Sequence, residues 1–169
     1  MHTAFTVLLN TASGLCFLVG LTLCFTAGPQ REVSNSVAAV SNRKTELGKA
    51  LFLDKRLSED RTVSCATCHD PASAFTSREA LAVGVGNRKG ARNAPTLLNS
   101  AFSKSYFWDG RAATLEEQAK QPLFNPSEMG LRDEASLLER VSSIAEYRRD
   151  FSRVFPRDGI TLNTIATTT

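Results

Sequence analysis

The sequence predicts helices in three stretches, and in the first and third of them the hydrophobic residues recur at helical spacing. In the second of these, Thr114 and Glu117 have the pattern of a capping box, which predicts that a short helix starts there and ends before Pro122. The third stretch predicts one long or two consecutive amphipathic helices. A last apolar pattern begins at Ile160. The three stretches are residues 45–53, 114–121 and 133–155.

Residues 70–99 separate the first two predicted helices and are rich in Gly, Asn and Pro. These residue types favour turns, so this segment should be mostly loop. A loop of this length within a compact domain usually wraps a functional group. The sequence therefore predicts an all-α fold with long loops.

The N-terminal segment has a different composition. From Thr3 to Gln30 there is no acidic or basic side chain, and Leu, Val, Phe, Ala and Thr dominate. This pattern is typical of an export signal or a membrane anchor, although no Lys or Arg precedes it and the cleavage site near Ala27 is poor. Residues 21–24 also resemble a lipoprotein box. We expect a signal peptide or anchor helix over residues 1–28, a linker over 29–44, and one domain over 45–169.

Composition and charge exclude several classes of protein. The chain has 169 residues, 42% of them hydrophobic and 22% charged, as in an ordinary globular domain. The net charge is +3, and the basic residues are mixed evenly with acidic ones. A surface for nucleic acid is therefore not expected.

The remaining chemistry is concentrated in the sequence CATCH. Beyond residue 28 the chain has only two cysteines, Cys65 and Cys68, and one histidine, His69. On a helix these three side chains share one face. Two thiols at this spacing can add to the vinyl groups of one porphyrin, and the adjacent imidazole then reaches the iron as proximal ligand.

Two other interpretations of the CxxCH are weaker. A structural zinc site needs four ligands, and CATCH offers three. A thioredoxin-like redox pair needs a βαβ context, and no convincing strands flank the motif. We therefore predict one covalently bound haem c. Because haem c is attached outside the cytoplasm, this prediction agrees with the N-terminal segment and indicates a periplasmic protein.

Four segments carry a resemblance to a known family. From about Leu47 to the end, the chain resembles the N-terminal domain of bacterial di-haem cytochrome c peroxidases and the related MauG-type enzymes. The resemblance implies a cytochrome c-like haem domain whose haem is the peroxidatic one, with an electron-storing haem in a second domain. The segments are LGKALFLDKRLSEDRTVSCATCHDPASAF, GVGNRKGARNAPTLLN, FWDGRAATLEEQ and NPSEMG.

The resemblance also implies roles for single residues. His69 would be the proximal ligand of the haem iron, Glu128 the distal acid-base residue and Gln118 a distal-pocket amide. Trp108 would lie between the two haems, and Asn93 would be a calcium ligand at the domain junction. The implied partners are hydrogen peroxide, a small redox donor protein of the cytochrome c or cupredoxin type, and a separate second-haem domain.

Glu128 and Gln118 can also be interpreted from local sequence alone. Glu128 follows Asn125 and Pro126 at the spacing of a local capping box. Gln118 shares a helix face with Leu115 and Pro122, and an amide on an apolar stripe needs a buried partner.

The other residues also have simpler interpretations. Trp108 lies among aromatic residues, which is typical of core packing. Asn93 precedes Ala94 and Pro95 and can simply form a turn. Arg111 either pairs with a haem propionate or lies on the surface, and the sequence leaves both open.

The sequence also departs from the resembled family. Residues 70–92 contain no His, so a second histidine ligand from this loop is not expected, and no second CxxCH follows. We therefore expect that the electron-storing domain is absent, as in a truncated product, a fragment or half of a split enzyme. Two alternatives stay open: an electron-transfer cytochrome c with Met129, 60 residues after His69, as axial ligand, or an inactive fragment.

Overall fold

The structure is a computed structural model that describes the backbone of residues 29–169 and the side chains from residue 38 onward. The predicted signal or anchor over residues 1–28 lies outside the described residues. Residues 42–169 form one compact unit, and residues 29–41 belong to another. Across residues 29–169, no helix combines the length and apolar composition needed to cross a membrane.

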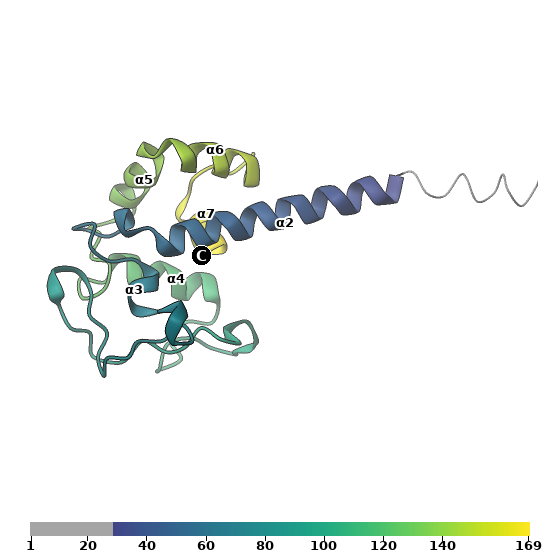
Figure 1. Ribbon diagram of the computed structural model, residues 1–169. Coiled ribbons are helices and arrows are strands. Elements are labelled where there is room, and N and C mark those ends of the chain that lie inside the picture. Colours follow the sequence, from purple (N-terminus) through teal and green to yellow (C-terminus); the bar gives the residue numbers. More distant parts are fainter. Residues whose placement is uncertain (1–28) are drawn as a thin grey trace, which may run out of the picture. The chain divides into compact units, whose positions relative to one another are not determined.

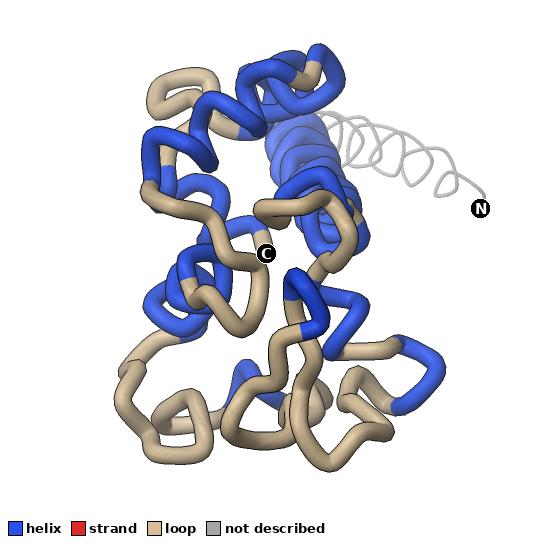
Figure 2. Tube along the Cα trace, turned by 90° about the vertical axis from the view of Figure 1, so that its left-hand side faces the viewer, coloured by secondary structure: helices blue, strands red, loops and turns tan. Residues whose placement is uncertain are grey.

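Helices and loops make up the described residues, without a β-strand, which confirms the predicted all-α class (Figure 2). Four short 3-10 helices lie in the connections: η1 (Lys55–Leu57), η2 (Pro71–Ser73), η3 (Val85–Asn87) and η4 (Ser100–Phe102). The α-helices are α2 (Pro29–Leu53), α3 (Cys65–Cys68), α4 (Leu115–Phe124), α5 (Glu134–Ser143), α6 (Ala145–Val154) and α7 (Leu162–Thr168).

Helix α2 starts earlier than the sequence predicts. We expected a linker over residues 29–44 and a helix from Thr45, but the segment is helical from Pro29 onward. Pro29 occupies the first helical position, where its missing N–H costs nothing, and no further Pro or Gly occurs before Gly48. Val33, Val37 and Val40 lie at i, i+4 and i+7, a helical spacing, but our expectation rested on the apolar spacing that begins at Leu47.

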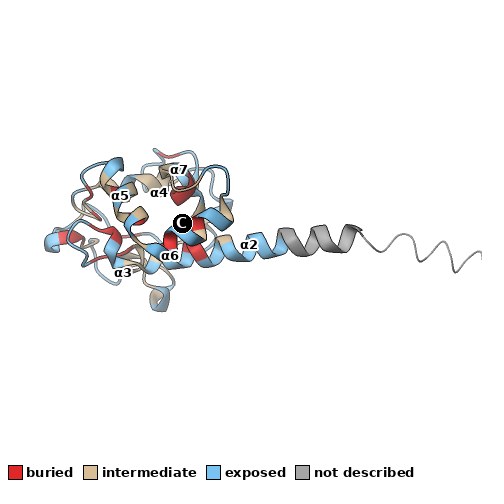
Figure 3. Ribbon diagram, turned by 90° about the horizontal axis from the view of Figure 1, so that it is seen from above, coloured by how far each residue is buried: buried red, intermediate tan, exposed pale blue. Residues whose placement is uncertain are grey.

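The hydrophobic core of residues 42–169 forms where the end of α2 meets the C-terminal helices. Leu47 and Leu51 of α2 are buried there, and Figure 3 shows buried residues in red on α2 and α7. At Gly48 the backbone of α2 lies very close to the end of α7, so that a Cβ at this position would collide with the backbone carbonyl of Thr168. The other core residues are Leu57, Leu123, Met129, Leu131, Leu137, Val141, Tyr147, Phe151 and Ile165.

Helix α4 continues past its predicted end and includes Pro122. Proline removes only the N–H that would bond to the carbonyl of Gln118, a modest loss this close to the end of the helix. The following segment then folds back, and the Met129 N–H donates to the Pro122 carbonyl at 3.1 Å. At the start of the helix only half of the predicted capping box forms, because the Glu117 carboxylate accepts from the Ala113 N–H at 2.8 Å.

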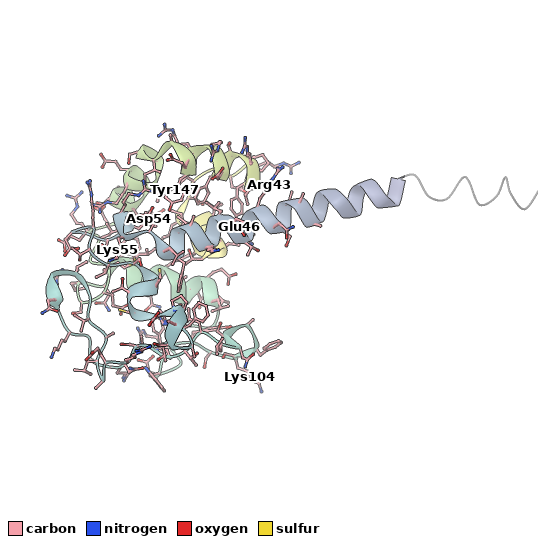
Figure 4. All side chains as sticks on the ribbon, in the orientation of Figure 1. Arg43, Glu46, Asp54, Lys55, Lys104 and Tyr147 are labelled. Atoms are coloured by element: carbon pink, nitrogen blue, oxygen red, sulfur yellow. The ribbon has the colours of Figure 1, made fainter. Side chains whose placement is uncertain are left out.

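The third predicted stretch is two helices, α5 and α6. Ile144 separates them with an extended backbone (φ −91°, ψ 116°). Helix α7 follows, and Thr161 and Thr164 cap its start reciprocally. A hydrogen bond of 2.7 Å from the Tyr147 hydroxyl to the Asp54 carboxylate joins α6 to the end of α2 (Figure 4).

Residues 70–112 are mostly loop, which confirms the loop predicted over residues 70–99 and extends it, and they lie at the end of the compact unit opposite α5 and α6 (Figure 1). Isolated antiparallel bridges shape the loops without forming a sheet: Asp70 with Thr76, Val83 with Lys89, and Tyr106 with Ala112. Helices α3 and α4 lie between these loops and α5, so the loops cover the side of the unit that carries the CATCH motif.

Candidate haem site

A cavity of about 700 Å³ opens among α3, α4 and the long loops. Its size is in the range of small-molecule and cofactor sites. The structure thus brings together residues that lie up to 60 positions apart in the sequence. The predicted site residues that line the cavity are Cys68, His69, Asn93, Trp108, Arg111, Gln118 and Glu128.

The CATCH motif forms the single turn of α3. Ser64 caps the turn, and its backbone N–H donates to the Thr67 hydroxyl at 2.9 Å. His69 is the first residue after the helix. The Cys68 thiol lies in the cavity wall and donates to the Val83 carbonyl at 3.6 Å, whereas Cys65 packs against the hydrophobic core.

The two cysteines form no disulfide, and both thiols favour the protonated form. Burial raises the pKa of Cys65 to about 11, and the negative charges of Cys68 and Glu128 act in the same direction. Burial and Glu128 also raise the pKa of Cys68. A reactive redox pair needs a lowered thiol pKa, so the structure gives no support to the thioredoxin-like alternative.

The zinc alternative also finds no support in the structure. Among the described residues, no group of three or more His, Cys, Asp and Glu side chains is arranged to hold a metal ion. Cys65, Cys68 and His69 are not supplemented by a fourth ligand, which a closed structural zinc site needs.

His69 is held in one tautomer by the loops. Its Nδ1 lies 3.0 Å from the Pro95 carbonyl and 3.2 Å from the Phe75 carbonyl. Carbonyl oxygens only accept, so Nδ1 carries the hydrogen and the lone pair remains on Nε2 for a metal. Burial lowers the pKa of His69, which keeps the ring neutral. The orientation, the tautomer and the two adjacent thiols fit a c-type haem.

Glu128 lies in the turn after α4, and its carboxylate accepts a hydrogen bond of 2.7 Å from the Asn125 side-chain amide. Burial raises its pKa, and this hydrogen bond and the charge of Arg111 partly offset the rise. A reciprocal capping box does not form, because the backbone N–H of Asn125 bonds to the Gln121 carbonyl at 3.1 Å. The structure therefore places a carboxyl group with a raised pKa in the wall of the cavity.

Gln118 reaches the same cavity from α4. Leu115 and Pro122, which share its helix face, line the cavity with it, so the predicted face is the one that meets the site. The Gln118 amide makes no hydrogen bond to another described residue, and it is half-buried. An amide in this position is available to a molecule in the cavity.

Trp108 and Asn93 are joined to each other. The indole N–H of Trp108 donates to the Asn93 carbonyl at 2.9 Å, and the side chain is 62% exposed, so the interpretation of Trp108 as core packing is wrong. The Asn93 amide nitrogen donates to the Ser77 carbonyl at 3.1 Å. Its oxygen accepts from the Thr76 hydroxyl at 3.3 Å. Calcium binding by Asn93 stays a prediction.

Arg111 is partly exposed and also lines the cavity, and its pairing with a haem propionate stays a prediction. Its guanidinium lies 3.5 Å from the centre of the Phe107 ring and pairs with Asp109 at 2.9 Å. It also donates to the Gln121 side chain at 3.0 Å.

Met129 does not take part in the site. It is 4% exposed and packs in the hydrophobic core, away from the cavity that contains His69. The structure therefore gives no support to the alternative in which Met129 is the axial ligand of an electron-transfer cytochrome.

Several important contacts were missed from the sequence because they are made by the backbone. The carbonyls of Phe75 and Pro95 orient His69, and Gly84 and Val85 lie against Glu128. Because nearly every residue carries the same backbone groups, the residue types in the sequence do not reveal such contacts. The one available signal was the density of glycines in residues 84–90, since glycine often marks a close approach between backbones.

The all-α fold and the oriented CxxCH together define a c-type haem protein. The chain belongs to a particular family of this class, described as di-haem cytochrome c peroxidase, whose sequence profile matches residues 42–168.

Characterised relatives agree with this assignment. Cytochrome c551 peroxidase of Pseudomonas aeruginosa is 43% identical over 121 residues, which are 71% of this chain and 34% of the relative. Methylamine utilization protein MauG of Paracoccus denitrificans is 40% identical over 77% of this chain and 37% of its own length. The chain thus spans about a third of the length of these relatives.

Solved structures show the same fold. A MauG-like protein associated with microbial copper homeostasis has a TM-score of 0.69 at 38% identity, covering 75% of this chain and 38% of that protein. The di-haem peroxidase BthA from Burkholderia thailandensis has a TM-score of 0.65 at 28% identity, covering 74% and 36%.

Proposed function

We propose that this chain is a peroxidase domain that binds one haem c and reduces hydrogen peroxide to water outside the cytoplasm, with electrons from a small donor protein. The observation that supports it is the shared cavity, into which His69, Gln118 and Glu128 all project from separate parts of the sequence. The names of the relatives support the peroxidase class.

Cys65 and Cys68 would hold the haem through thioether bonds, and His69 Nε2 would bind its iron. When bound, the haem supplies a redox-active iron at which peroxide can be reduced. The Phe75 and Pro95 carbonyls keep the imidazole ring in the orientation and tautomer that this bond requires.

Glu128 performs the proton transfer. Its carboxylate accepts the proton of one peroxide oxygen and delivers it to the other, which leaves as water when the O–O bond breaks. Two electrons from the donor and two protons from solvent complete the reduction of one peroxide to two waters. Positioned acid-base catalysis of this kind contributes on the order of 10² to 10⁴ in rate.

The remaining residues assist this reaction. Gln118 orients the peroxide oxygens by hydrogen bonding, because its amide has no other partner among the described residues. Trp108 relays electrons from a separate second-haem domain, and its 62% exposure leaves it accessible from that side. Asn93 contributes one oxygen to a calcium site that the second domain completes.

The substitution Glu128→Gln tests the proton-transfer role. It retains the size of the side chain and removes the ionisable group, so the reaction with peroxide should slow by about 10²-fold or more. Stopped-flow absorbance of the haem measures this rate directly. Haem content and helicity should be unchanged.

The matched control is Glu139→Gln, which removes the same charge from an exposed position on α5. Its peroxide rate should equal that of the wild type. If Glu128→Gln reacts as fast as the control, Glu128 is not the acid-base residue and the proposed mechanism fails.

A further inference from the structure

Residues 82–92 form a compact loop, here called the bracing loop. Its two ends are joined by a hydrogen bond of 3.0 Å from the Ala82 N–H to the Arg92 carbonyl. A second bond of 2.8 Å connects the Gly90 N–H to the Ala82 carbonyl. Gly84 and Val85, at its centre, are buried. This loop is the element that contacts the main chain of Glu128.

Two contacts connect the bracing loop to Glu128. The Val85 N–H donates to the Glu128 carbonyl at 2.9 Å. A Cβ added at Gly84 would lie 2.6 Å from the Cα of Glu128 and would overlap the carbonyl oxygens of Ser127 and Glu128. Gly84 has a φ of −105°, which any residue can adopt, so the close approach and not the backbone conformation requires glycine here.

The bracing loop is itself anchored away from Glu128. Arg88 bonds to the Glu59 carboxylate at 2.8 Å, and the Gly86 N–H donates to the Asp60 carboxylate at 2.9 Å. On the other side, the Val83 carbonyl lies 3.6 Å from Cys68 Sγ. The same loop therefore contacts both the haem-attachment motif and the backbone of Glu128.

We propose that Gly84 and Val85 are positioning residues that set the place of the Glu128 carboxylate in the cavity relative to the CATCH motif. This inference rests on the proposed function of Glu128. The carboxylate has one hydrogen bond, from Asn125, so its position depends on where its backbone is fixed. A misplacement of about 1 Å in a proton-transfer group can cost about 10²-fold in rate.

The substitution Gly84→Ala displaces the Glu128 turn without changing any side chain of the site. The control in the same loop is Lys89→Ala, at an exposed position that does not line the cavity. Two ligands of the haem-loaded protein provide the measurement. Cyanide is present at neutral pH as HCN and must lose a proton to bind ferric iron, whereas carbon monoxide binds ferrous iron without proton transfer.

Gly84→Ala should slow cyanide association by about 10-fold or more and leave carbon monoxide association unchanged. Lys89→Ala should leave both rates unchanged. Glu128→Gln is the reference and should slow cyanide alone. If Glu128→Gln has no effect on cyanide, the proposed function of Glu128 fails. If Glu128→Gln slows cyanide and Gly84→Ala does not, the positioning role alone is overturned. A loss of both rates in Gly84→Ala indicates general damage and also overturns it.

If Gly84→Ala does not fold, Arg88→Met decides the question. This surface substitution removes the bond to Glu59 and the 3.0 Å bond from Arg88 Nε to the Val85 carbonyl, so it loosens the bracing loop. Cyanide association should slow by about 2- to 5-fold with carbon monoxide unaffected. An unchanged cyanide rate in Arg88→Met would overturn the positioning role.

Discussion

At the scale of single residues, the site depends on the hydrogen bonds that the imidazole N–H of His69 donates. His69 Nδ1 faces two carbonyl oxygens from loop segments that lie 20 positions apart, Phe75 and Pro95. The sequence identified His69 as a ligand because CxxCH has a defined chemistry. It did not identify the acceptors, because a carbonyl oxygen is present at every position.

The coordination of the iron follows from which side chains reach the cavity. Residues 70–92 contain no His and Met129 is in the core, so the haem-loaded ferric protein should bind cyanide without prior reduction. Met129→Leu should leave the optical spectrum unchanged and cost less than about 1.5 kcal/mol of stability. An optical titration with cyanide checks the binding and the spectrum, and chemical denaturation checks the stability. A sulfur-to-iron band that disappears in Met129→Leu would contradict this prediction.

Asp54 makes stability depend on pH. Burial alone would raise its pKa, but hydrogen bonds from Arg56 and Tyr147 lower it below the ordinary value. The stabilisation is therefore fully present above the unfolded pKa of about 3.9 and is lost as pH falls through the folded pKa. Asp54→Asn should lower the free energy of unfolding by about 1–3 kcal/mol at pH 7.

Urea unfolding at pH 7 and at pH 3 measures this effect. The difference in unfolding free energy between the wild type and Asp54→Asn should shrink at the lower pH. Asp158→Asn, at an exposed position, is the control and should differ little from the wild type at pH 7. A difference that stays constant across this range would show that the Asp54 carboxylate charge is not the stabilising feature.

At the scale of elements, the sequence predicted helices where an apolar face packs against the core, and it failed where helix formation has another cause. The early turns of α2 have only a short row of apolar residues, Val33, Val37 and Val40, and Val40 is 44% exposed. Pro122 ends a helix in most sequences, but here the segment after α4 folds back and bonds to its last turn. Over residues 133–155 the sequence left one or two helices open, because the break at Ile144 has no Pro or Gly to mark it.

The packing of α2 against α7 depends on Gly48. In a helix with free space around the glycine, the substitution Gly→Ala stabilises the protein by about 0.5–1 kcal/mol. Here the added Cβ meets the Thr168 backbone, so Gly48→Ala should instead destabilise by about 1–3 kcal/mol. Chemical denaturation shows whether Gly48→Ala raises or lowers the free energy of unfolding. Lys49→Ala, at the exposed neighbouring position, should stay within about 0.5 kcal/mol of the wild type.

At the scale of the whole molecule, the long loops carry most of the site and several exposed hydrophobic side chains. Leu98, Phe102 and Trp108 are 54%, 86% and 62% exposed. The sequence predicted the loop, and with the help of the family resemblance it named residues that the structure places around one cavity. Exposure could not be predicted in this way, because aromatic residues in a loop are more often buried.

This difference in exposure predicts where oxidative damage occurs. When the haem-loaded protein receives excess peroxide without a reductant, Trp108, which is exposed and lines the cavity, should gain oxygen. Met129, at 4% exposure, should be spared. Peptide mass spectrometry after a timed exposure tests this. Oxidation of Met129 ahead of Trp108 would show that reactive species travel through the core.

The burial of Cys65 limits when the cofactor can be attached. Leu47 and Leu51 lie early in the chain, and Ile165, which shares their core, lies more than a hundred positions later, so this part of the core closes late in folding. Until then the CATCH thiols are open to solvent and to an attachment enzyme. After closure, Cys65 is half-buried and packs against the core, and burial raises the pKa of its thiol to about 11, so the thiol reacts slowly. The pairing of α2 with α7 thus limits the time during which the haem can be attached. A chain that completes this pairing before attachment would be trapped without haem.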